Sequence, residues 1–501
     1  MILAIDLGTT ATKVSLVSPT MTVLASSQSR IRTYTAPGGI SEQESGDWSG
    51  TVIYCVRELH EKFPSLASSV EAIAITGHML GCTPVDATGR ALSRHLLHGD
   101  TRSRVQAEKI EQVLGAGTIY QLTGNRAGPS TLSKMMWFKA EKPEIYAQTA
   151  YFLQSKDFVT GWLKGTYDTT DYSDASHACL IDVHKLRYFD DVYLSLGLDR
   201  AKLPSLHRGT DLVGRLCPDA AAKLGLPAGI PIAAGAGDGA CSAIGAGAAK
   251  AGDHYCCLGT TAWTACMSEK PVLDPAMRNF NIVSGDGYSV GSFGTIQNAG
   301  RAIDWAQAAC QVKDLKQFDA LAAAVEAGSD GLIFLPYLAG ERTPHFDPDA
   351  RGAYIGLSTE HQTGHLLRAV LEGISMALRD TVAMHRDDGL VIDNMHLIGG
   401  GGRSDLWRQI LTSVLGVPVS RLASPSEHAT TVGAAILAGT AIGHFADLSA
   451  GTQMLEKLDT EMPDPLTVER YDQLHGIYRQ LYATLKPIHD QLANYRQNMG
   501  C

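Results

Sequence analysis

Two short segments of the chain each combine a glycine with neighbouring threonine hydroxyls, a composition suited to binding phosphate. Leu7-Gly8-Thr9-Thr10 recurs as Leu258-Gly259-Thr260-Thr261. Glycine lets backbone N–H groups approach an anion without a Cβ between them, and threonine hydroxyls add further donors. One copy alone is also typical of an ordinary β-turn. Because the tetrapeptide occurs twice, we expect two phosphate-binding turns that face each other and clamp a nucleoside triphosphate.

The two copies differ in the charged residues beside them. Asp6 directly precedes the first copy, and Lys13 follows it closely. A carboxylate at this point cannot bind phosphate itself, but it can hold Mg²⁺, usually through water. The ammonium group of Lys13 could reach a phosphate oxygen. The second copy follows Cys256-Cys257 and offers donors without a charge, so we expect Asp6 to be the metal ligand.

Another carboxylate, Asp238, stands in the glycine-rich turn Gly235-Ala-Gly237-Asp238-Gly239. The turn follows an apolar run, and open α/β sheets place ligands at the carboxyl ends of their strands. An aspartate there can accept the proton of an attacking hydroxyl in phosphoryl transfer. An N-cap role is a common alternative. A dinucleotide site is a further one, because Gly235-x-Gly237-x-x-Ala240 fits G-x-G-x-x-A, although no clean βαβ unit follows.

Two other groups of residues could carry chemistry. The run Gly399-Gly-Gly-Gly402 with Arg403-Ser404, between a strand pattern and a helix pattern, indicates either a surface that a nucleotide approaches or a flexible connection. His78, His95 and His98 lack partners at metal-ligand spacing, so we do not expect them to bind metal. The P-loop pattern G-x-x-x-x-G-K-[ST] does not occur, which disfavours a P-loop kinase.

These residues need strands that end at turns, and the hydrophobic pattern supplies them. We expect strands at 2–5, 13–17, 21–26, 72–75 and 230–234, with helices at 46–62 and 240–249. The chain then begins again, with strands at 254–258 and 262–267. Repetition in the same strand–turn–strand context predicts an internal duplication, with a boundary near 245–253. Helices at 366–385, 406–415 and 470–497 and a strand at 395–398 complete the second half.

Composition sets the class of protein. A chain of 501 residues is too long for one core, so we expect two domains. Apolar residues make up 45% and charged residues 19%, which is typical of a globular protein. The net charge of −10 argues against nucleic acid as a partner. We expect no membrane span, no signal peptide, a cytoplasmic location, and buried, reduced thiols for the ten cysteines.

Taken together, the motifs resemble the FGGY carbohydrate kinases of the actin-like ATPase superfamily. The likeness covers nearly the whole chain, and the motifs occur in the family's order. They are Asp6–Thr10 with Lys13, Asp100-Thr-Arg102-Ser103, Pro129-Ser-Thr-Leu-Ser-Lys134-Met-Met-Trp137-Phe-Lys, Gly237-Asp238-Gly239, Leu335-Pro-Tyr-Leu-Ala-Gly-Glu341-Arg-Thr-Pro344-His, Arg368-Ala-Val-Leu-Glu-Gly373, Gly399–Gln409, and Glu427 with Gly433-Ala-Ala.

This resemblance implies an α/β fold of two actin-like (ribonuclease H-like) domains with a cleft between them. The sugar-binding domain would span residues 1–247 and the nucleotide-binding domain residues 248–501. It also implies the site residues: Asp238 as the catalytic base; His78, Met79, Leu80, Asp100 and Arg102 for the sugar; Thr9, Thr10, Lys13, Gly259, Thr260, Thr261, Gly300, Gly400, Gly401, Ser404 and Gln409 for ATP; and Asp6 for Mg²⁺.

The implied reaction is ATP-dependent phosphorylation of a primary hydroxyl of a small sugar. Motifs of the second half are similar to those of xylulose kinases, which implies conversion of D-xylulose to D-xylulose 5-phosphate. The sugar side departs from that pattern, with Gly77-His78-Met79-Leu80-Gly81 for the usual Gly-Gln-Met-His-Gly and His98-Gly99 for Trp-Asn. Losing a polar partner can change sugar discrimination by orders of magnitude, so gluconate, another ketose or a polyol stays open.

Two other classes are also open. A nucleotide-switched, chaperone-like ATPase opens with the same loop, but it would carry a β-rich peptide-binding domain that we do not expect here. The dehydrogenase reading depends on Gly235 to Ala240 alone. A homodimer is plausible for the family.

Overall fold

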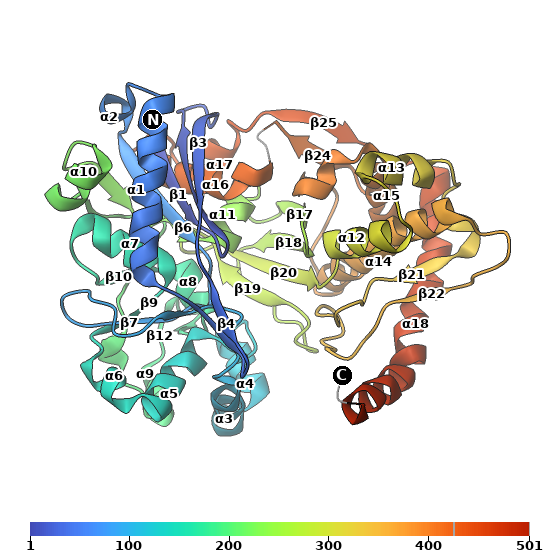
Figure 1. The fold of residues 1–501 in the computed structure, drawn as a ribbon, viewed down its shortest axis with the longest axis horizontal. Helices are drawn as coiled ribbons and strands as arrows, with labels where there is room; N and C mark the ends of the chain where they lie inside the picture. Colours follow the sequence, from blue (N-terminus) through green and yellow to red (C-terminus); the bar gives the residue numbers. More distant parts are fainter. Residues whose placement is uncertain (424–425, 500–501) are drawn as a thin grey trace.

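Each half of the chain folds around its own seven-stranded mixed sheet (Figure 1). The computed structural model describes residues 1–423 and 426–499, so Cys501 lies outside it. Helices cover the sheets of both halves, and the two α/β domains lie side by side (Figure 1). The predicted fold class is therefore confirmed. The predicted division between residues 247 and 248 falls in the connection between the last helix of the first half and the first strand of the second.

The N-terminal sheet has the order β14-β15-β6-β1-β2-β3, and β16 also pairs with β6. Ile2–Ile5 are buried completely, because a strand covered on both faces has a continuous apolar sequence. β1 pairs antiparallel with β2 and parallel with β6, and β16 runs parallel to β6. The strands are β1 (Ile2–Leu7), β2 (Ala11–Val17), β3 (Val23–Arg30), β6 (Ala72–Gly77), β14 (Leu212–Arg215), β15 (Pro231–Ala233) and β16 (Ala236–Gly237).

The C-terminal sheet has the order β19-β20-β18-β17-β23-β24-β25 and repeats the centre of the first. β17 pairs antiparallel with β18 and parallel with β23, as β1 does with β2 and β6. The same local topology thus occurs around both Leu-Gly-Thr-Thr segments. The strands are β17 (His254–Leu258), β18 (Ala262–Ser268), β19 (Phe280–Val283), β20 (Val290–Ile296), β23 (Met395–Ile398), β24 (Val419–Leu422) and β25 (Lys457–Glu461).

Smaller sheets extend both domains. Their strands are β4 (Tyr34–Ala36), β5 (Ile40–Gln43), β7 (Thr83–Val85), β8 (His95–Leu96), β9 (Tyr151–Leu153), β10 (Thr169–Asp171), β11 (Ile181–Asp182), β12 (Arg187–Tyr188), β13 (Ser205–His207), β21 (Ile333–Leu335) and β22 (Ala353–Ile355). Among them, β5 pairs with β4 on one side and with β8 on the other, which brings Glu42 and Gln43 beside Leu96 and His95.

The helices of the first half are α1 (Ser45–Lys62), α2 (Leu66–Ser69), α3 (Arg104–Leu114), α4 (Ala116–Thr123), α5 (Thr131–Glu141), α6 (Pro143–Gln148), α7 (Ser155–Lys164), α8 (Tyr172–His177), α9 (Asp190–Ser195), α10 (Pro218–Leu224) and α11 (Asp238–Gly245). Those of the second half are α12 (Gly300–Ala309), α13 (Leu315–Ala323), α14 (Thr363–Asp387), α15 (Asp405–Leu415), α16 (Ala429–Ala441), α17 (Leu448–Thr452) and α18 (Pro465–Asn498). The predicted strands and helices are found, with ends shifted by a few residues.

The two domains meet where α11 crosses α16, and both helices contribute to one buried apolar cluster. α16 comes from the second half but packs against β1 and β6 of the first sheet. The crossing is backbone to backbone. A Cβ on Gly245 would lie 1.9 Å from the carbonyl oxygen of Ala429, and one on Gly433 would lie 2.0 Å from that of Cys241. Glycine is therefore required at both positions for this close approach.

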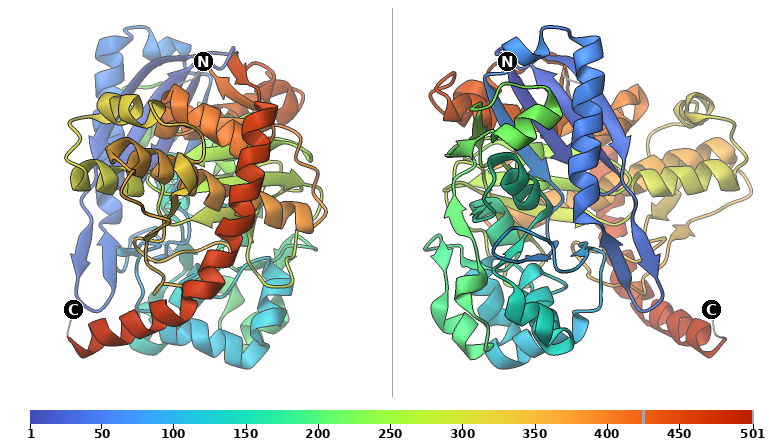
Figure 2. Two further views of the ribbon diagram at one scale, coloured as in Figure 1. Left: turned by 90° about the vertical axis from the view of Figure 1, so that its right-hand side faces the viewer. Right: turned by 60° about the vertical axis from the view of Figure 1, so that its left-hand side comes forward.

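α18 runs down the outside of the C-terminal domain, as Figure 2 shows. Its first part is held by the buried side chains of Tyr471 and Tyr478, and its end extends past the domain (Figure 2). The nine cysteines of the described part carry free thiols, and seven of them are buried. Over residues 1–423 and 426–499, every helix is too short or too polar to cross a bilayer.

Candidate active site

Asp6 and Asp238 lie at the carboxyl edge of the N-terminal sheet. Register places Asp6 at the end of β1 beside Thr76 of β6, while β16 delivers Gly237 beside Gly77, directly before Asp238 at the start of α11. Burial raises the pKa of Asp238 to about 7, and the charge of Asp6 contributes to the rise. Burial also raises the pKa of Asp6. The structure thus brings the two predicted acids together as an interacting pair.

The hydroxyl of Thr430 donates a hydrogen bond to Asp6 Oδ2 at 2.7 Å, and Thr430 stands at the start of α16. Lys13 Nζ donates to the carbonyl oxygen of Glu427, just before the same helix. Both charged residues of the first loop are therefore in contact with the second half of the chain. Thr9 and Thr10 form the turn between β1 and β2, with Thr10 exposed.

The second loop is the turn between β17 and β18. The amide of Gly259 donates to the carbonyl oxygen of Thr261 at 3.0 Å, which closes the turn. Gly300 opens α12 and its amide donates to the carbonyl oxygen of Gly259 at 2.9 Å. A Cβ on Gly300 would lie 2.9 Å from that same oxygen, so the helix and the loop pack without a side chain between them.

Beside the second loop lies a cavity of about 710 Å³, a size suited to a nucleoside. It contains six of the residues predicted to bind ATP: Gly259, Thr260, Gly300, Gly400, Gly401 and Ser404. Further lining comes from Leu258, Ile303, Asp304, Leu315, Lys316, Phe318, Asp319, Leu371, Arg403 and Trp407. Thr261 and Gln409 are not in the lining, and Gln409 is exposed on α15.

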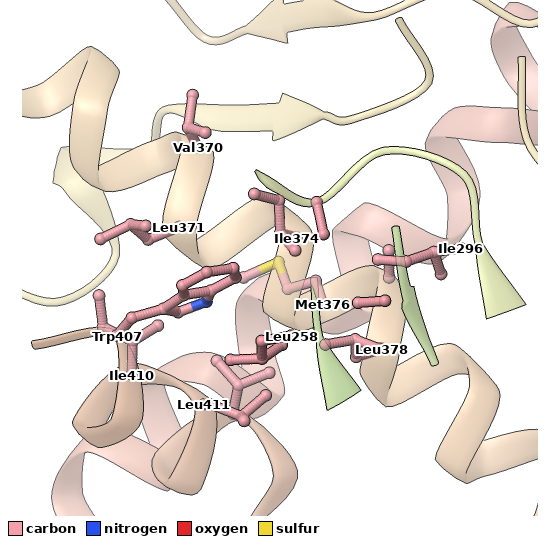
Figure 3. Close-up of a cluster of buried hydrophobic side chains, with 14 of the residues drawn as sticks. Leu258, Ile296, Val370, Leu371, Ile374, Met376, Leu378, Trp407, Ile410 and Leu411 are labelled. Carbon is pink, nitrogen blue, oxygen red and sulfur yellow. The ribbon is translucent and has the colours of Figure 1, made fainter. Parts of the chain in front are cut away.

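Trp407 is the apolar floor under the glycine run. Figure 3 shows its indole ring among Leu258, Leu371, Met376 and Ile410. A Cβ on Gly401 would lie 2.3 Å from this ring, so glycine lets the run lie flat against it. The indole N–H donates to Ser375 Oγ at 3.2 Å and fixes the ring from below. The glycines thus open the pocket, and the tryptophan keeps its floor rigid.

Three of the five residues predicted for the sugar side, His78, Met79 and Leu80, are neighbours in the chain but have different environments. His78 is buried, with its ring centroid 5.9 Å from that of Trp48 and 5.1 Å from that of His95, and burial lowers its pKa to about 3. Met79 packs against the Asp238 turn, because its Sδ lies 2.6 Å from where a Cβ on Gly237 would be. Leu80 has φ of +64° and is half-buried. Met79 thus touches the turn that carries Asp238, while the His78 imidazole belongs to an aromatic cluster.

Asp100 and Arg102 form a buried pair. Asp100 is fully buried, and its Oδ2 accepts from the backbone amide of Ser41 at 3.0 Å and from Arg102 Nη2 at 2.7 Å. The same Nη2 donates to Glu42 Oε1 at 2.6 Å, and the guanidinium lies over the ring of Trp137. The contacts of Asp100 hold Arg102 in one orientation, and the direct sugar contacts of both residues stay predictions.

A buried charged cluster beneath the Asp238 turn was not found from the sequence. Lys156 Nζ lies 2.7 Å from Asp157, 3.4 Å from Asp174 and 3.8 Å from Asp171. Burial opposes the charge of Lys156, but the three carboxylates outweigh it and raise the pKa of the ammonium. Charged residues at this spacing are also common on a solvated surface. The sequence therefore could not single out Lys156, Asp157, Asp171 and Asp174, and only their burial in the structure identifies the cluster.

Ser173 connects this cluster to the turn. Its hydroxyl donates to Asp171 at 2.6 Å, and its oxygen accepts from the amide of Gly237 at 2.8 Å. Gly237 is the residue before Asp238, so the cluster fixes the backbone that carries the candidate base.

Known proteins similar to this chain share its two-domain organisation. The models of the FGGY family of carbohydrate kinases match it with their N-terminal domain over residues 1–245 and their C-terminal domain over residues 254–442. Xylulose kinase of Bacillus subtilis (strain 168) is 32% identical over 99% of both chains, and gluconokinase of Bacillus licheniformis is 28% identical over 99% of this chain and 98% of its own. A ligand-bound crystal structure of xylulose kinase from Lactobacillus acidophilus has a TM-score of 0.92 at 25% identity and covers 98% of this chain and 99% of that one. The chain therefore belongs to the FGGY family of carbohydrate kinases.

Proposed function

We propose that the protein transfers the γ-phosphoryl group of ATP to a primary hydroxyl of a small sugar. The acid pair of Asp6, at the first threonine turn, and Asp238 carries this proposal, since it offers a metal ligand and a base at one edge of the N-terminal sheet. D-xylulose, giving D-xylulose 5-phosphate, is the favoured acceptor because similar proteins are xylulose kinases. Gluconate is the first alternative because of the gluconokinase relative, followed by another ketose or a polyol.

Asp238 is the base in this mechanism. With a pKa of about 7, a substantial fraction of its carboxylate is ionised near neutral pH and can take the proton of the sugar hydroxyl as the phosphoryl group transfers. Ser173 holds the turn, and Met79 packs against it from the sugar side. Backbone amides and hydroxyls of the two threonine turns hold the phosphates, while the nucleoside lies over Trp407 in the cavity beside the second turn.

The donor set fits Mg²⁺ bound together with the nucleotide. Mg²⁺ takes one or two carboxylates and completes its shell with phosphate oxygens and water. Asp6 supplies one carboxylate, and the described residues contain no cluster of three or more acidic, histidine or cysteine ligands that would enclose an ion. When bound, Mg²⁺ neutralises charge on the transferring phosphoryl group. Asp6 could hold the metal, directly or through water, with Oδ1, because the hydrogen bond from Thr430 uses only Oδ2.

ADP release from MgATP with a panel of sugars tests the proposal. We expect release that depends on a sugar, with D-xylulose giving the highest kcat/KM and gluconate, other ketoses and polyols lower values. Release without any sugar would support a nucleotide-switched ATPase instead. Absence of ATP use, together with binding of a dinucleotide, would support the dehydrogenase reading of Gly235 to Ala240.

Substitutions at Leu80 test which sugar is the substrate. We expect Leu80→His to raise kcat/KM for D-xylulose relative to gluconate by about tenfold, because a hydrogen-bonding group is added beside the sugar. Leu80→Phe adds a ring of similar size without that group and serves as the matched control. An equal effect of both variants on both sugars would exclude Leu80 from sugar selection. The cytoplasmic location and the homodimer stay predictions.

A further inference from the structure

Gln43 is a fully buried glutamine in contact with the first phosphate loop. It ends β5, and its Nε2 donates to the carbonyl oxygen of Thr9 at 2.7 Å and to Thr33 Oγ1 at 3.1 Å. Its Oε1 accepts from the indole N–H of Trp48 at 3.0 Å. Every polar atom of the amide is therefore used, and the amide can take only one orientation.

The second loop has the same carbonyl anchored by different donors. Thr260 stands where Thr9 stands in Leu-Gly-Thr-Thr, and its carbonyl oxygen accepts from the amides of Ala299 at 3.1 Å and Arg301 at 3.3 Å. These amides belong to the start of α12. In the first half two side chains do what a helix start does in the second, because Thr33 Oγ1 also donates to the Thr9 carbonyl oxygen, at the longer distance of 3.4 Å. Because two unrelated sets of donors bond the equivalent carbonyl oxygen, we interpret a fixed carbonyl at this position as a requirement of the loop.

An anchored carbonyl determines where the next amide points. The peptide unit is planar and trans, so the C=O of Thr9 and the N–H of Thr10 point in opposite directions. The hydrogen bond from Gln43 holds the Thr9 carbonyl toward the buried side of the loop. The amide of Thr10, which is an exposed residue, must then point in the opposite direction, away from Gln43. We infer that Gln43 is a positioning residue, which orients the Thr9–Thr10 peptide so that its amide can donate to the nucleotide phosphates.

The same short strand also holds the sugar side. Next to Gln43, the Ser41 amide and the Glu42 carboxylate bind Asp100 and Arg102. A change at β5 could therefore disturb both ligands, so the nucleotide must be measured alone. This inference rests on the proposed function only through MgATP, because no sugar is needed to test it.

Calorimetric titration with MgATP, in the absence of sugar, measures Kd for wild type, Gln43→Met and Gln43→Glu. Methionine has a similar length but cannot donate, and we expect Kd to rise about tenfold, the factor that corresponds to about 1.4 kcal/mol. A buried carboxyl favours its protonated form, which has one O–H donor. Gln43→Glu should bind nearly as wild type at pH 6 and approach Gln43→Met at pH 9, each value taken relative to wild type at that pH.

The charged and titratable groups around position 43 are few. They are the pairs Glu42–Arg102 and Glu44–Arg94, Arg32 and Tyr34 at the neighbouring strand β4, the carboxylates Asp6, Asp47 and Asp100, the Lys13 ammonium, and His78 and His95. Burial lowers the pKa of both histidines far below the range of the test. The pH dependence that Gln43→Glu adds over wild type therefore belongs to the new carboxyl group.

Tyr188→Phe is the matched control. It removes another buried donor to a backbone carbonyl in the same domain, that of Pro204 at 2.8 Å, and has no hydrogen bond to the first loop. We expect this variant to lower the unfolding temperature without changing Kd. Unchanged Kd in folded Gln43→Met, or the same pH dependence in Gln43→Glu and Gln43→Met, would overturn the inference alone. Wild-type protein that fails to bind MgATP would overturn the proposed function, and the inference with it.

Discussion

Replacement of Asp238 by asparagine should make the ligand-free protein more stable and inactive. The pKa of Asp238 rises from 3.8 to about 7 on folding, a shift of roughly three units. At 1.36 kcal/mol per unit, the ionised carboxylate costs the folded state about 4 kcal/mol above pH 7. Because the folded pKa is raised, this cost is absent below pH 3.8, grows as pH rises, and is complete above about pH 7. Asparagine has the same shape and never ionises.

Urea unfolding of wild type and Asp238→Asn without nucleotide or metal measures this cost. We expect the variant to be more stable by about 2 kcal/mol at pH 5 and by about 4 kcal/mol at pH 8, with kcat lower by at least about 100-fold. Asp47→Asn, at an exposed carboxylate of α1, should show no such dependence on pH. A stability difference that is the same at both pH values would refute the raised pKa, and a variant that retains most of its turnover would remove Asp238 from the base role.

Three further substitutions test other parts of the structure: Ser173 beside the Asp238 turn, Gly300 at the second threonine turn, and the buried His385 of α14. Ser173→Ala removes the acceptor of the Gly237 amide, so kcat should fall about tenfold while Kd for MgATP stays unchanged. Ser173→Thr keeps a hydroxyl and should restore kcat. An equal loss of kcat in both variants would refute the positioning role. Gly300→Ala would place a Cβ 2.9 Å from the Gly259 carbonyl oxygen, so KM for ATP should rise about tenfold in steady-state assays while the sugar KM stays constant. Burial lowers the pKa of His385 from 6.5 to about 4. Between these values the unfolded chain takes up a proton at this position and the folded protein does not, so the free energy of unfolding falls as pH falls below 6.5. His385→Gln should therefore lose about 2 kcal/mol less stability than wild type between pH 7 and pH 5 in urea unfolding, and parallel losses would contradict this.

Local sequence patterns were enough for the sheets and the loops. A buried strand, a glycine turn and a second strand are set by neighbouring residues, so both hairpins were predicted, and their repetition indicated two halves. The glycine run was identified by its place between a strand and a helix, and it lines the cavity of the second domain. The strand, turn and helix around Asp238 were predicted for the same reason, since they are contiguous in the chain, and its role as the base stays a prediction.

Contacts between distant segments could not be predicted in this way. Ser173 accepts from Gly237, which is 64 residues further along the chain. Lys156 lies in a buried cluster with Asp174, although charged residues of this kind are usually on the surface. Gln43 lies in a polar stretch without any pattern. His78 was predicted to shape the sugar pocket by resemblance, and its burial against Trp48 depends on how α1 packs on the sheet.

The glycine contact between α11 and α16 determines how the two domains can move. Because Gly245 and Gly433 allow the two backbones to touch, no flexible side chain lies between them, and we expect the helices to turn about this contact more easily than they slide along it. The crossing is then a fulcrum. In a rotation about this crossing, groups near it, such as Asp6 with its bond to Thr430, would move less than groups at the outer edges of both domains. A bulkier residue at either glycine would push the two helices apart and hold the two domains in a more open arrangement.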